Sequence, residues 1–324
     1  MKGKLRDLFV RPEMRAFVEE AHRTDDYSFF DLLHGYVYGR WIYTYIGIGV
    51  GEHPLMRLFS PLARLWKRLF TSRAAAEVQK AAPARDGQKV TFADTYHGKV
   101  VSLEAAKQLV TVNQEIHLPD LEKVIPYARA RDIVLKNPDH IAVLDCPCRM
   151  SREHPCLPMD VCLIVGEPFA SFVTAQQPEH ARWITPEEAV QILQEEDARG
   201  HVHHAFFKDA MLGRFYAICN CCPCCCGAMQ AQRNGTPMLA SSGYVCDVDS
   251  ESCVGCGLCA DVCPFGALAV DEESGTAVVD AAACMGCGVC VGRCAQGALS
   301  LVRDAAKGEP LEIQQLMAAV GEGS

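Results

Sequence analysis

The stretch CVGCGLCADVCPFGALAVDEESGTAVVDAAACMGCGVCVGRC, residues 253–294, decides how the C-terminal part of the chain folds. Its first four cysteines have the spacing C-x2-C-x2-C-x3-C, followed by Pro264, and its last four repeat that spacing 31 residues later. The triplet at 266–268, Gly-Ala-Leu, recurs at the same offset at 297–299. Thiolates with this spacing bind the corners of an iron–sulfur cubane, whereas zinc prefers two separated CxxC pairs. The repeat therefore predicts iron–sulfur clusters.

This stretch resembles the bacterial-type ferredoxin that carries two [4Fe–4S] clusters, and the resemblance covers residues 244–302. It implies a pseudo-symmetric ferredoxin-like domain in which the fourth cysteine of each run ligates the other cluster. The implied ligands of cluster one are Cys253, Cys256, Cys259 and Cys294, and those of cluster two are Cys284, Cys287, Cys290 and Cys263. Ala295 stands where the second run usually has proline, so we expect a local difference in the turn with both clusters retained.

The cysteine content indicates metal binding in a reducing compartment. The chain has 324 residues, which suits two or three domains, and its 19 cysteines cannot all pair with one another. The first residues are charged and lead into no apolar segment of the kind found in secretory signals. Cysteine-rich chains of this type bind metals more often than they form disulfides. We expect a cytoplasmic protein of an anaerobe or a facultative anaerobe.

The N-terminal part, residues 1–90, is predicted to be a helical and basic segment that ends in a linker. It holds 15 Lys and Arg against 10 Asp and Glu, although the whole chain has a net charge of −9. Residues 8–30 are predicted to be helical with polar breaks. Residues 36–51 are aromatic and apolar, but they are glycine-broken and shorter than the ~20 apolar residues that cross a bilayer. They are predicted to be buried, to face a partner, or to lie at a membrane surface.

Residues 55–70 have the pattern of an amphipathic helix. The basic residues fall opposite an apolar stripe that contains Trp66 and Phe70, and they are Arg57, Arg64, Lys67 and Arg68. Such a helix can lie in the plane of a membrane, and it can equally pack on its own domain. The sequence leaves both interpretations open, so peripheral membrane contact and membrane association stay among the expectations.

Residues 91–243 are predicted to form a cysteine-rich domain of α/β type. Helices are expected at 103–112 after an N-cap at Ser102, at 120–136, and from Thr185 to about Arg199. Short apolar runs at 141–144, 163–165 and 215–218 predict buried strands. The predicted fold class is therefore α+β, with an N-terminal helical segment, this middle domain, the ferredoxin-like domain at 244–302 and a helical tail at 303–324.

The cysteines outside the ferredoxin repeat form a second candidate metal site. Six of them lie within residues 219–226, which is too dense for ordinary core packing, whereas Cys246 can be a buried small hydrophobe. The candidate pool, not all of which can be ligands, is Cys146, Cys148, Cys156, Cys162, Cys219, Cys221, Cys222, Cys224, Cys225 and Cys226. Three interpretations remain open: a third iron–sulfur cluster, a zinc site, or a redox-active thiol centre.

Arg149 follows Cys148 directly and is expected to lower a thiol pKa. His203 and His204 are weaker candidates for proton transfer. The chain also resembles iron–sulfur proteins in which a domain with CPCR and CCxCCC motifs is joined to a C-terminal ferredoxin domain.

No dinucleotide fingerprint and no P-loop is present, and the acidic chain has no nucleic-acid-binding motif. Binding of NAD, FAD, ATP or nucleic acid in those modes is therefore not expected.

Three functions follow as hypotheses. The first is an electron-transfer protein or redox subunit that relays electrons through the clusters, and through a third metal centre, to a partner protein or complex. The second is a reductase, hence an oxidoreductase, with its catalytic centre in residues 146–226. The third is a binding or sensing protein that its clusters stabilise.

Overall fold

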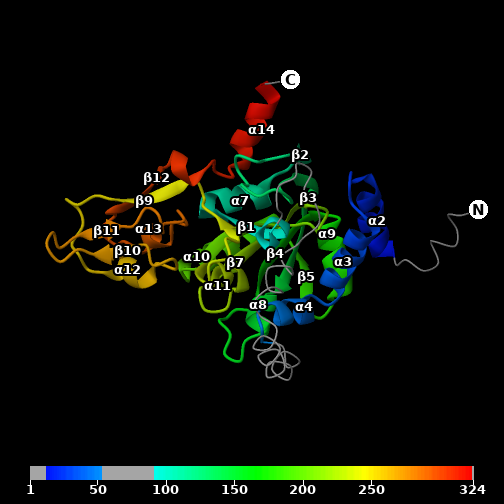
Figure 1. Cartoon of the computed structure of the whole chain (residues 1–324), viewed down its shortest axis with the longest axis horizontal. Coiled ribbons are helices and arrows are strands. Elements are labelled where there is room, and N and C mark those ends of the chain that lie inside the picture. The colour runs from blue at the N-terminus through cyan, green and yellow to red at the C-terminus, as the bar shows by residue number, and fades with distance from the viewer. Residues whose placement is uncertain (1–11, 53–90, 323–324) are drawn as a thin grey trace, which may run out of the picture.

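The computed structural model describes residues 12–52 and 91–322, and it combines a central sheet, helices on both of its faces and a small cysteine-rich lobe (Figure 1). The N-terminal helices are α2 (Pro12–Arg23), α3 (Phe29–Arg40) and α4 (Ile42–Gly49). The next elements are α6 (Phe92–Thr95), β1 (Tyr96–Val101), α7 (Leu103–Thr111), β2 (Ile116–Leu118), β3 (Ile133–Asp145), α8 (Pro147–Met150), β4 (Asp160–Glu167), α9 (Phe169–Gln176), β5 (Ala181–Ile184), α10 (Pro186–Ala198), β6 (Val202–Lys208), β7 (Arg214–Cys221), α11 (Gly227–Arg233) and β8 (Leu239–Ala240).

The C-terminal lobe and tail hold the remaining elements. The lobe consists of β9 (Tyr244–Val248), α12 (Leu258–Val262), β10 (Leu268–Val270), β11 (Ala277–Val279), α13 (Val289–Arg293) and β12 (Leu299–Arg303). A 3-10 turn, η2 (Ala305–Lys307), and α14 (Ile313–Glu322) follow it. The mixture of helices and sheets agrees with the predicted class.

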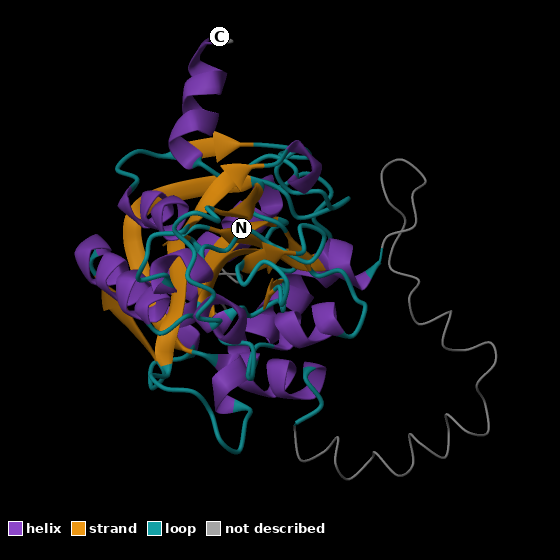
Figure 2. Cartoon of the chain, turned by 90° about the vertical axis from the view of Figure 1, so that its left-hand side faces the viewer, coloured by secondary structure: helices purple, strands orange, loops and turns teal. Residues whose placement is uncertain are grey.

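The strands of the central sheet run through the middle of the molecule with helices around them (Figure 2). The sheet has eight strands in the order β2-β3-β4-β7-β6-β1-β8, with β5 paired to β3. Among these pairs only β1 with β8 is parallel, and every other pair is antiparallel. The α/β type expected for the middle domain is therefore wrong. The connection between β6 and β7 is residues 209–213, which is too short for the crossover that a parallel pair requires.

Each face of the sheet has its own hydrophobic core. On one face, α2, α3, α4, α9 and α11 contribute to the larger core, which contains Phe17, Tyr38, Phe169 and Phe172. On the other face, α7, α10 and α14 cover a second core around Leu109, with Leu193 and Ile313. The sheet is thus buried on both sides, which explains the nearly continuous apolar runs of its central strands.

Local sequence signals placed two helices of the middle domain correctly. The Ser102 hydroxyl accepts a hydrogen bond from the backbone N–H of Ala105 at the start of α7. The Thr185 hydroxyl accepts one from the backbone N–H of Glu188 at the start of α10. The three predicted strands are also confirmed, as parts of β3, β4 and β7.

The helix predicted at 120–136 is wrong. Residues 120–132 form irregular turns, and β3 begins at Ile133. Pro126 interrupts the segment, and Asp120 and Ala130 both have positive φ values, which a right-handed helix cannot accommodate. Asn137, which directly follows the predicted helix, lies within β3 at an irregularity in the pairing with β4, and its φ is 44°.

The N-terminal helices pack on the same core as the sheet. The helix expected at 8–30 is interrupted after α2, and the Ser28 side chain caps α3 in a reciprocal pair of hydrogen bonds with Asp31. The aromatic segment at 36–51 forms the end of α3 and α4; Tyr38 and Ile42 are buried, whereas Trp41 and Ile48 are 49% and 42% exposed, so the buried interpretation is confirmed for one side of the segment alone. A Cβ atom at Gly39 would lie 2.2 Å from Phe172, so only glycine permits this approach.

The amphipathic helix predicted at 55–70 lies outside the described residues. In the described ranges, none of the helices has both the length and the apolar character needed to cross a membrane.

The two halves of the C-terminal lobe repeat the same hydrogen bonds. Cys253 N–H donates to the Asp249 carbonyl at 3.0 Å, and Cys284 N–H donates to the Asp280 carbonyl at 2.9 Å. Gly257 and Gly288 have positive φ values of 78° and 84° where α12 and α13 begin. The lobe is not isolated from the rest of the chain, because Val289 belongs to the larger core of the sheet.

Asp209 gives the fold a predicted pH dependence. Burial raises the pKa of Asp209 to about 6 although Arg129 opposes the shift. The folded state therefore binds more protons than the unfolded state between about pH 4 and pH 6, and stability falls as the pH rises through this window.

We expect the wild-type chain to gain about 1–1.5 kcal/mol of stability from this carboxyl at pH 5 relative to pH 7.5. Asp209→Asn should remove that gain, whereas the exposed Asp139→Asn should keep it. Thermal unfolding of each variant at the two pH values is the measurement. An equal pH response in the wild type and in Asp209→Asn would contradict the prediction.

Candidate metal centres

The cysteines expected to bind cluster one surround one cavity of the C-terminal lobe. Its lining contains Cys253, Cys256, Cys259 and Cys294. The first three come from the loop that precedes α12 and from α12 itself, and the fourth ends α13. The structure thus brings the fourth cysteine of the second run to the first three of the first run, as the resemblance implies.

A second cavity of the lobe gathers the other set. Its lining contains Cys263, Cys284, Cys287 and Cys290, together with Cys246. A donor set of four thiols at each cavity fits a [4Fe–4S] cluster, which supplies one-electron storage when it is bound. The assignment of ligands to each cluster remains a proposal that these placements support.

Backbone amides are aimed at three of these sulfur atoms. Ala277 N–H points to Cys253 Sγ at 3.4 Å, and Ala267 N–H points to Cys263 Sγ at 3.2 Å. Cys246 N–H points to Cys284 Sγ, also at 3.4 Å. Hydrogen bonds to ligand sulfurs stabilise negative charge on the cluster and thereby help to set its reduction potential.

Cys246 has a different place from the one suggested by the sequence alone. It is buried, as expected for a small hydrophobe, but its Sγ lies 3.6 Å from Cys290 Sγ. The thiol therefore contacts a candidate ligand of cluster two. Its position in β9, outside both repeats, gave no signal of this contact.

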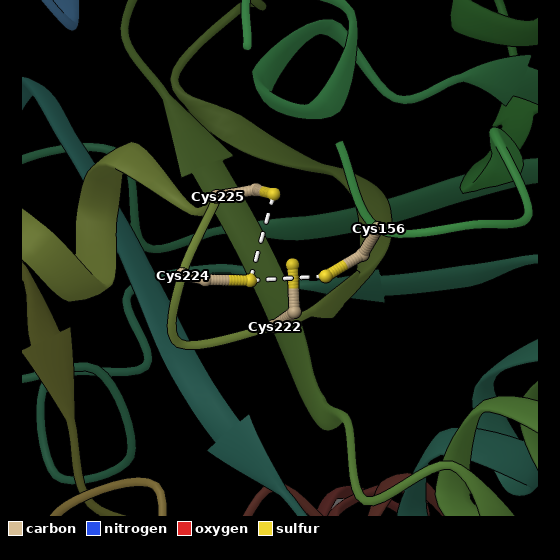
Figure 3. A group of neighbouring side chains, drawn as sticks. All are labelled: Cys156, Cys222, Cys224 and Cys225. Carbon is tan, nitrogen blue, oxygen red and sulfur yellow. Dashed lines mark hydrogen bonds between the residues drawn. The ribbon is translucent and has the colours of Figure 1, made fainter. Parts of the chain in front are cut away.

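The ten cysteines of the middle domain separate into two groups. Four of them, here called the outer cysteines, are Cys156, Cys222, Cys224 and Cys225 (Figure 3), and their sulfur atoms all lie within 4.8 Å of one another. Cys224 Sγ lies 2.9 Å from Cys156 Sγ and 3.6 Å from Cys225 Sγ. In the part of the chain that the structure describes, this is the only group of three or more such ligand atoms at that spacing.

Arginine side chains hold the loop of the outer cysteines in place. Arg152 donates through Nη2 to the Cys225 carbonyl at 3.0 Å and pairs through Nη1 with Glu52 at 2.8 Å. Arg233 donates through Nη1 to the Pro223 carbonyl at 3.0 Å. The loop between β7 and α11 is thus fixed by charged donors outside the thiol group.

The other six, here called the inner cysteines, line a cavity at one end of the central sheet, and Cys222 and Cys225 of the outer group border the same cavity. They are Cys146, Cys148, Cys162, Cys219, Cys221 and Cys226. Strand register brings two of them together, because Cys162 of β4 pairs directly with Cys219 of β7. Directly paired residues of antiparallel strands project to the same face, and Cys221 follows on that face of β7.

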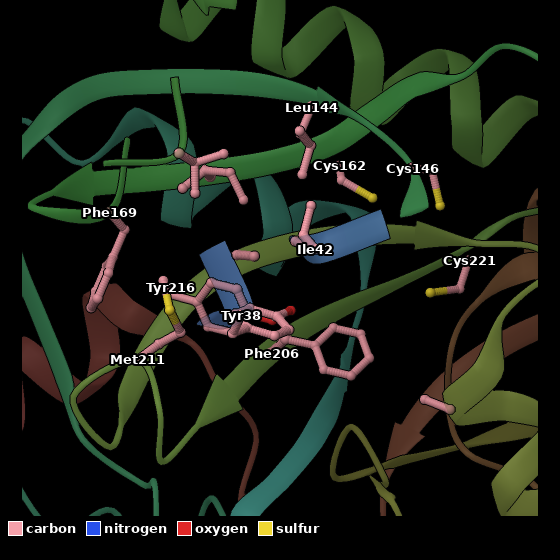
Figure 4. Close-up of a cluster of buried hydrophobic side chains, with 14 of the residues drawn as sticks. Tyr38, Ile42, Leu144, Cys146, Cys162, Phe169, Phe206, Met211, Tyr216 and Cys221 are labelled. Atoms are coloured by element: carbon pink, nitrogen blue, oxygen red, sulfur yellow. The ribbon is translucent and has the colours of Figure 1, made fainter. Parts of the chain in front are cut away.

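The remaining inner cysteines come from the loops and caps beside these strands. Cys146 and Cys148 flank Pro147 at the start of α8, and Cys226 is the N-cap residue of α11. Figure 4 shows Cys146, Cys162 and Cys221 at one end of the buried cluster that includes Ile42. Gly227 is required next to Cys226, because a Cβ atom there would lie 2.5 Å from Val50.

The thiols of the inner cysteines influence one another's ionisation around the cavity. The pKa of Cys146 responds to Cys148 and Cys162, that of Cys162 responds also to Cys219, and that of Cys226 responds to Cys148 and Cys221. Hydrogen bonds from its two thiol neighbours, with a smaller contribution from Arg149, lower the pKa of Cys146. Contact with ionised neighbours, together with burial, raises the pKa of Cys148 and of Cys162.

Aromatic residues form the opposite wall of this cavity. Tyr38 and Ile42 of the N-terminal helices line it, as does Tyr216 of β7. The hydroxyl groups of Tyr38 and Tyr216 are 2.8 Å apart, and burial raises the pKa of both phenols. Lys208 lies over the rings of Tyr38 and Tyr96 at 4.9 Å from each, and burial lowers the pKa of this lysine to about 8.

Arg149 anchors the CPCR segment through a fully buried ion pair. Its Nη2 atom lies 2.7 Å from Glu196 Oε2 and also donates to the Asn220 carbonyl at 3.1 Å. Burial would raise the pKa of Glu196, but hydrogen bonds from His201 and Arg149 lower it. The guanidinium therefore mainly fixes the position of the CPCR segment, because it ties α8 to α10 and β7. Its effect on the pKa of a neighbouring thiol, which the sequence suggested, is secondary.

The two candidate histidines lie in β6 and are fully buried. His203 Nδ1 contacts Asn220 Oδ1 at 2.6 Å, which is a structural contact. His204 pairs across the sheet with Cys219, and neither of its ring nitrogens has a hydrogen-bond partner among the described residues. Burial lowers the pKa of His204 to about 3, so the imidazole is neutral.

Residues 252–298 match the family model for the 4Fe-4S dicluster domain, Fer4_7. No curated protein matches the chain. A [4Fe–4S] dicluster domain is therefore part of this chain, and an electron-transfer or redox role follows from it.

The placement of Cys246 leads to a test of ligand identity. Cys246→Ala should leave the iron and sulfide content unchanged, because the four cysteines of the cavity remain, while the potential of one cluster shifts with its surroundings. Cys290→Ser should instead remove about four iron atoms per chain. Iron and sulfide analysis with potentiometric EPR measures both effects, and loss of iron from Cys246→Ala would contradict the assignment.

Proposed function

We propose that the protein is an iron–sulfur electron-transfer protein or redox subunit. It relays electrons through two [4Fe–4S] clusters, and through a further metal centre in the middle domain, to a partner protein or complex. The supporting observation is that the cluster-two side of the lobe and the inner cysteines share one core. Met285, Cys287 and Phe265 pack against the same buried cluster that contains Cys146 and Cys162.

Polar contacts fix the lobe to the middle domain on this side. Arg233 donates through Nη2 to the Pro264 carbonyl at 2.9 Å, directly after Cys263, and its other terminal nitrogen binds Pro223 in the loop of the outer cysteines. The Ser242 hydroxyl donates to the Gly286 carbonyl at 2.7 Å, next to Cys287. An internal electron route needs a short and constant distance between redox centres. A rigid interface between the lobe and the middle domain keeps that distance constant.

The opposite end of the lobe supports an entry point for electrons. In cluster one the Cys256 side chain is exposed, and the neighbouring Val254 and Leu258 are 65% and 52% exposed. Small apolar patches beside an accessible centre suit the weak and transient interfaces of electron-transfer complexes. The lobe lies at one end of the molecule in Figure 1, which leaves this surface open to a donor.

A reductase is the second candidate function, favoured by the cavity of the inner cysteines. Convergent thiols, two tyrosine hydroxyl groups and a lysine with a lowered pKa near one cavity are the ingredients of a site that both accepts electrons and supplies protons. In that case the ferredoxin-like lobe would provide electrons to the enzyme's own active site.

Leu258 offers a test of the proposed entry point. Reduced bacterial-type ferredoxin should reduce the wild-type clusters under anaerobic conditions, and stopped-flow absorbance should follow their bleaching. Leu258→Glu should slow this reduction several-fold by placing a charge in the docking patch. Val302→Glu, at a 40% exposed site on β12, is the matched control and should react like the wild type.

Reduction of both variants by dithionite should be complete, because this small reductant needs no docking surface. Equal rates for Leu258→Glu and the wild type with the protein donor would overturn the entry point. Clusters that show no reduced EPR signal even with dithionite would overturn the electron-transfer function itself.

A further inference from the structure

We propose that the inner cysteines bind a polynuclear metal–sulfur cluster, and that the outer cysteines form a separate site for a single tetrahedral metal ion. The middle domain would then carry two distinct metal centres. The proposal deepens the proposed function by naming the cofactor at the end of the route, although metal binding itself does not depend on electron transfer.

Sulfur spacing separates the two sites. Around one tetrahedral zinc ion with Zn–S bonds of about 2.3 Å, the sulfur atoms lie about 3.8 Å apart. The outer cysteines meet this requirement, since all their sulfur atoms lie within 4.8 Å of one another. In a cubane each thiolate binds a different iron, so the sulfur atoms stand farther apart than around one ion.

The ferredoxin-like lobe supplies an internal comparison. Within the described ranges, no three of the lobe's cysteines have sulfur atoms within 4.8 Å of one another, although they line cavities that suit cubane clusters. The inner cysteines share this property, because no three of their sulfur atoms lie within 4.8 Å of one another. Their arrangement around a cavity therefore resembles a cluster site and differs from the compact outer site.

The number of thiols also exceeds what one ion can use. The six inner cysteines line the cavity together with Cys222 and Cys225 of the outer group, whereas a structural zinc site takes four ligands. Soft thiolates favour iron–sulfur clusters or zinc over hard cations. A polynuclear cluster offers several metal atoms, so more than four thiolates can be ligands at once.

Burial gives a further reason to expect cations here. Cys146, Cys162, Cys221 and Cys226 are all at most 9% exposed, and they belong to the main hydrophobic core. Thiolates crowded in such surroundings repel one another, and several cannot ionise together unless metal charge compensates them. A polynuclear cluster supplies that compensation at several points around the cavity.

His204 is a second, independent observation. It is fully buried on the same face as Cys219, directly across the strand pair, and both of its ring nitrogens lack partners among the described residues. An unpaired buried polar group costs about 1–3 kcal/mol. A ligand at the adjacent cavity would relieve this cost by accepting a hydrogen bond from the ring or by binding its nitrogen.

Elemental analysis of the full-length protein is the test, after anaerobic purification and incubation with iron and sulfide. The wild type should hold clearly more than the eight iron atoms of two [4Fe–4S] clusters, with about one zinc ion per chain. Eight iron atoms or fewer in a sample whose reduced lobe clusters give their EPR signal would overturn the proposal. That result would leave the proposed ferredoxin function standing.

Matched double variants separate the two sites. Cys162→Ser/Cys219→Ser should lose the iron and sulfide in excess of the lobe clusters while it keeps zinc. Cys156→Ser/Cys224→Ser should lose the zinc ion while it keeps the excess iron. Loss of the excess iron only from the second variant would overturn the assignment. If a variant does not fold, the wild-type iron and zinc counts decide by themselves.

Discussion

Like charges cannot be crowded into an apolar cavity without compensation, and this constraint governs the middle domain. Contacts between neighbouring thiols push their ionisation apart, so that the pKa of Cys146 falls while those of Cys148 and Cys162 rise. The metal cluster that we propose for this cavity would remove the conflict, because its positive charge would compensate the thiolates that bind it. The surrounding structure therefore holds thiols from several segments of the chain together at this cavity.

The elements that position these cysteines lie far apart in the sequence. The pairing of β4 with β7 aligns Cys162 with Cys219, and the buried Arg149–Glu196 ion pair ties the CPCR segment to α10. The N-terminal helices close the cavity through Tyr38 and Ile42, so the first part of the chain is as much a component of the site as the cysteine loops are. The C-terminal lobe packs its cluster-two side on the same core. A change in any of these elements would alter both the stability of the fold and the environment of the cysteines at this cavity.

The parts of this architecture that sequence predicted are those encoded locally. The ferredoxin repeat could be recognised because its ligands follow fixed short spacings. The starts of α7 and α10 could be predicted because the N-cap residues Ser102 and Thr185 stand directly before them. The division of ten cysteines into inner and outer groups could not be predicted, because Cys224 and Cys226 are two residues apart yet belong to different groups. Strand register and a loop turn decide that division. The segment at 120–132 has a helix-like composition, but Pro126 interrupts it, and the left-handed conformations of Asp120 and Ala130 have no signal in the local sequence.

The central claim is that the chain contains more redox centres than its ferredoxin-like lobe, and that electrons reach them from the lobe. Anaerobic coulometric titration of the full-length protein, loaded with iron and sulfide, tests this claim most directly. Each [4Fe–4S] cluster of the lobe takes up one electron. We expect uptake of more than two electrons per chain, with the additional uptake in equilibrium with the lobe clusters. Uptake that ends at two electrons, with both lobe clusters fully reduced, would contradict it.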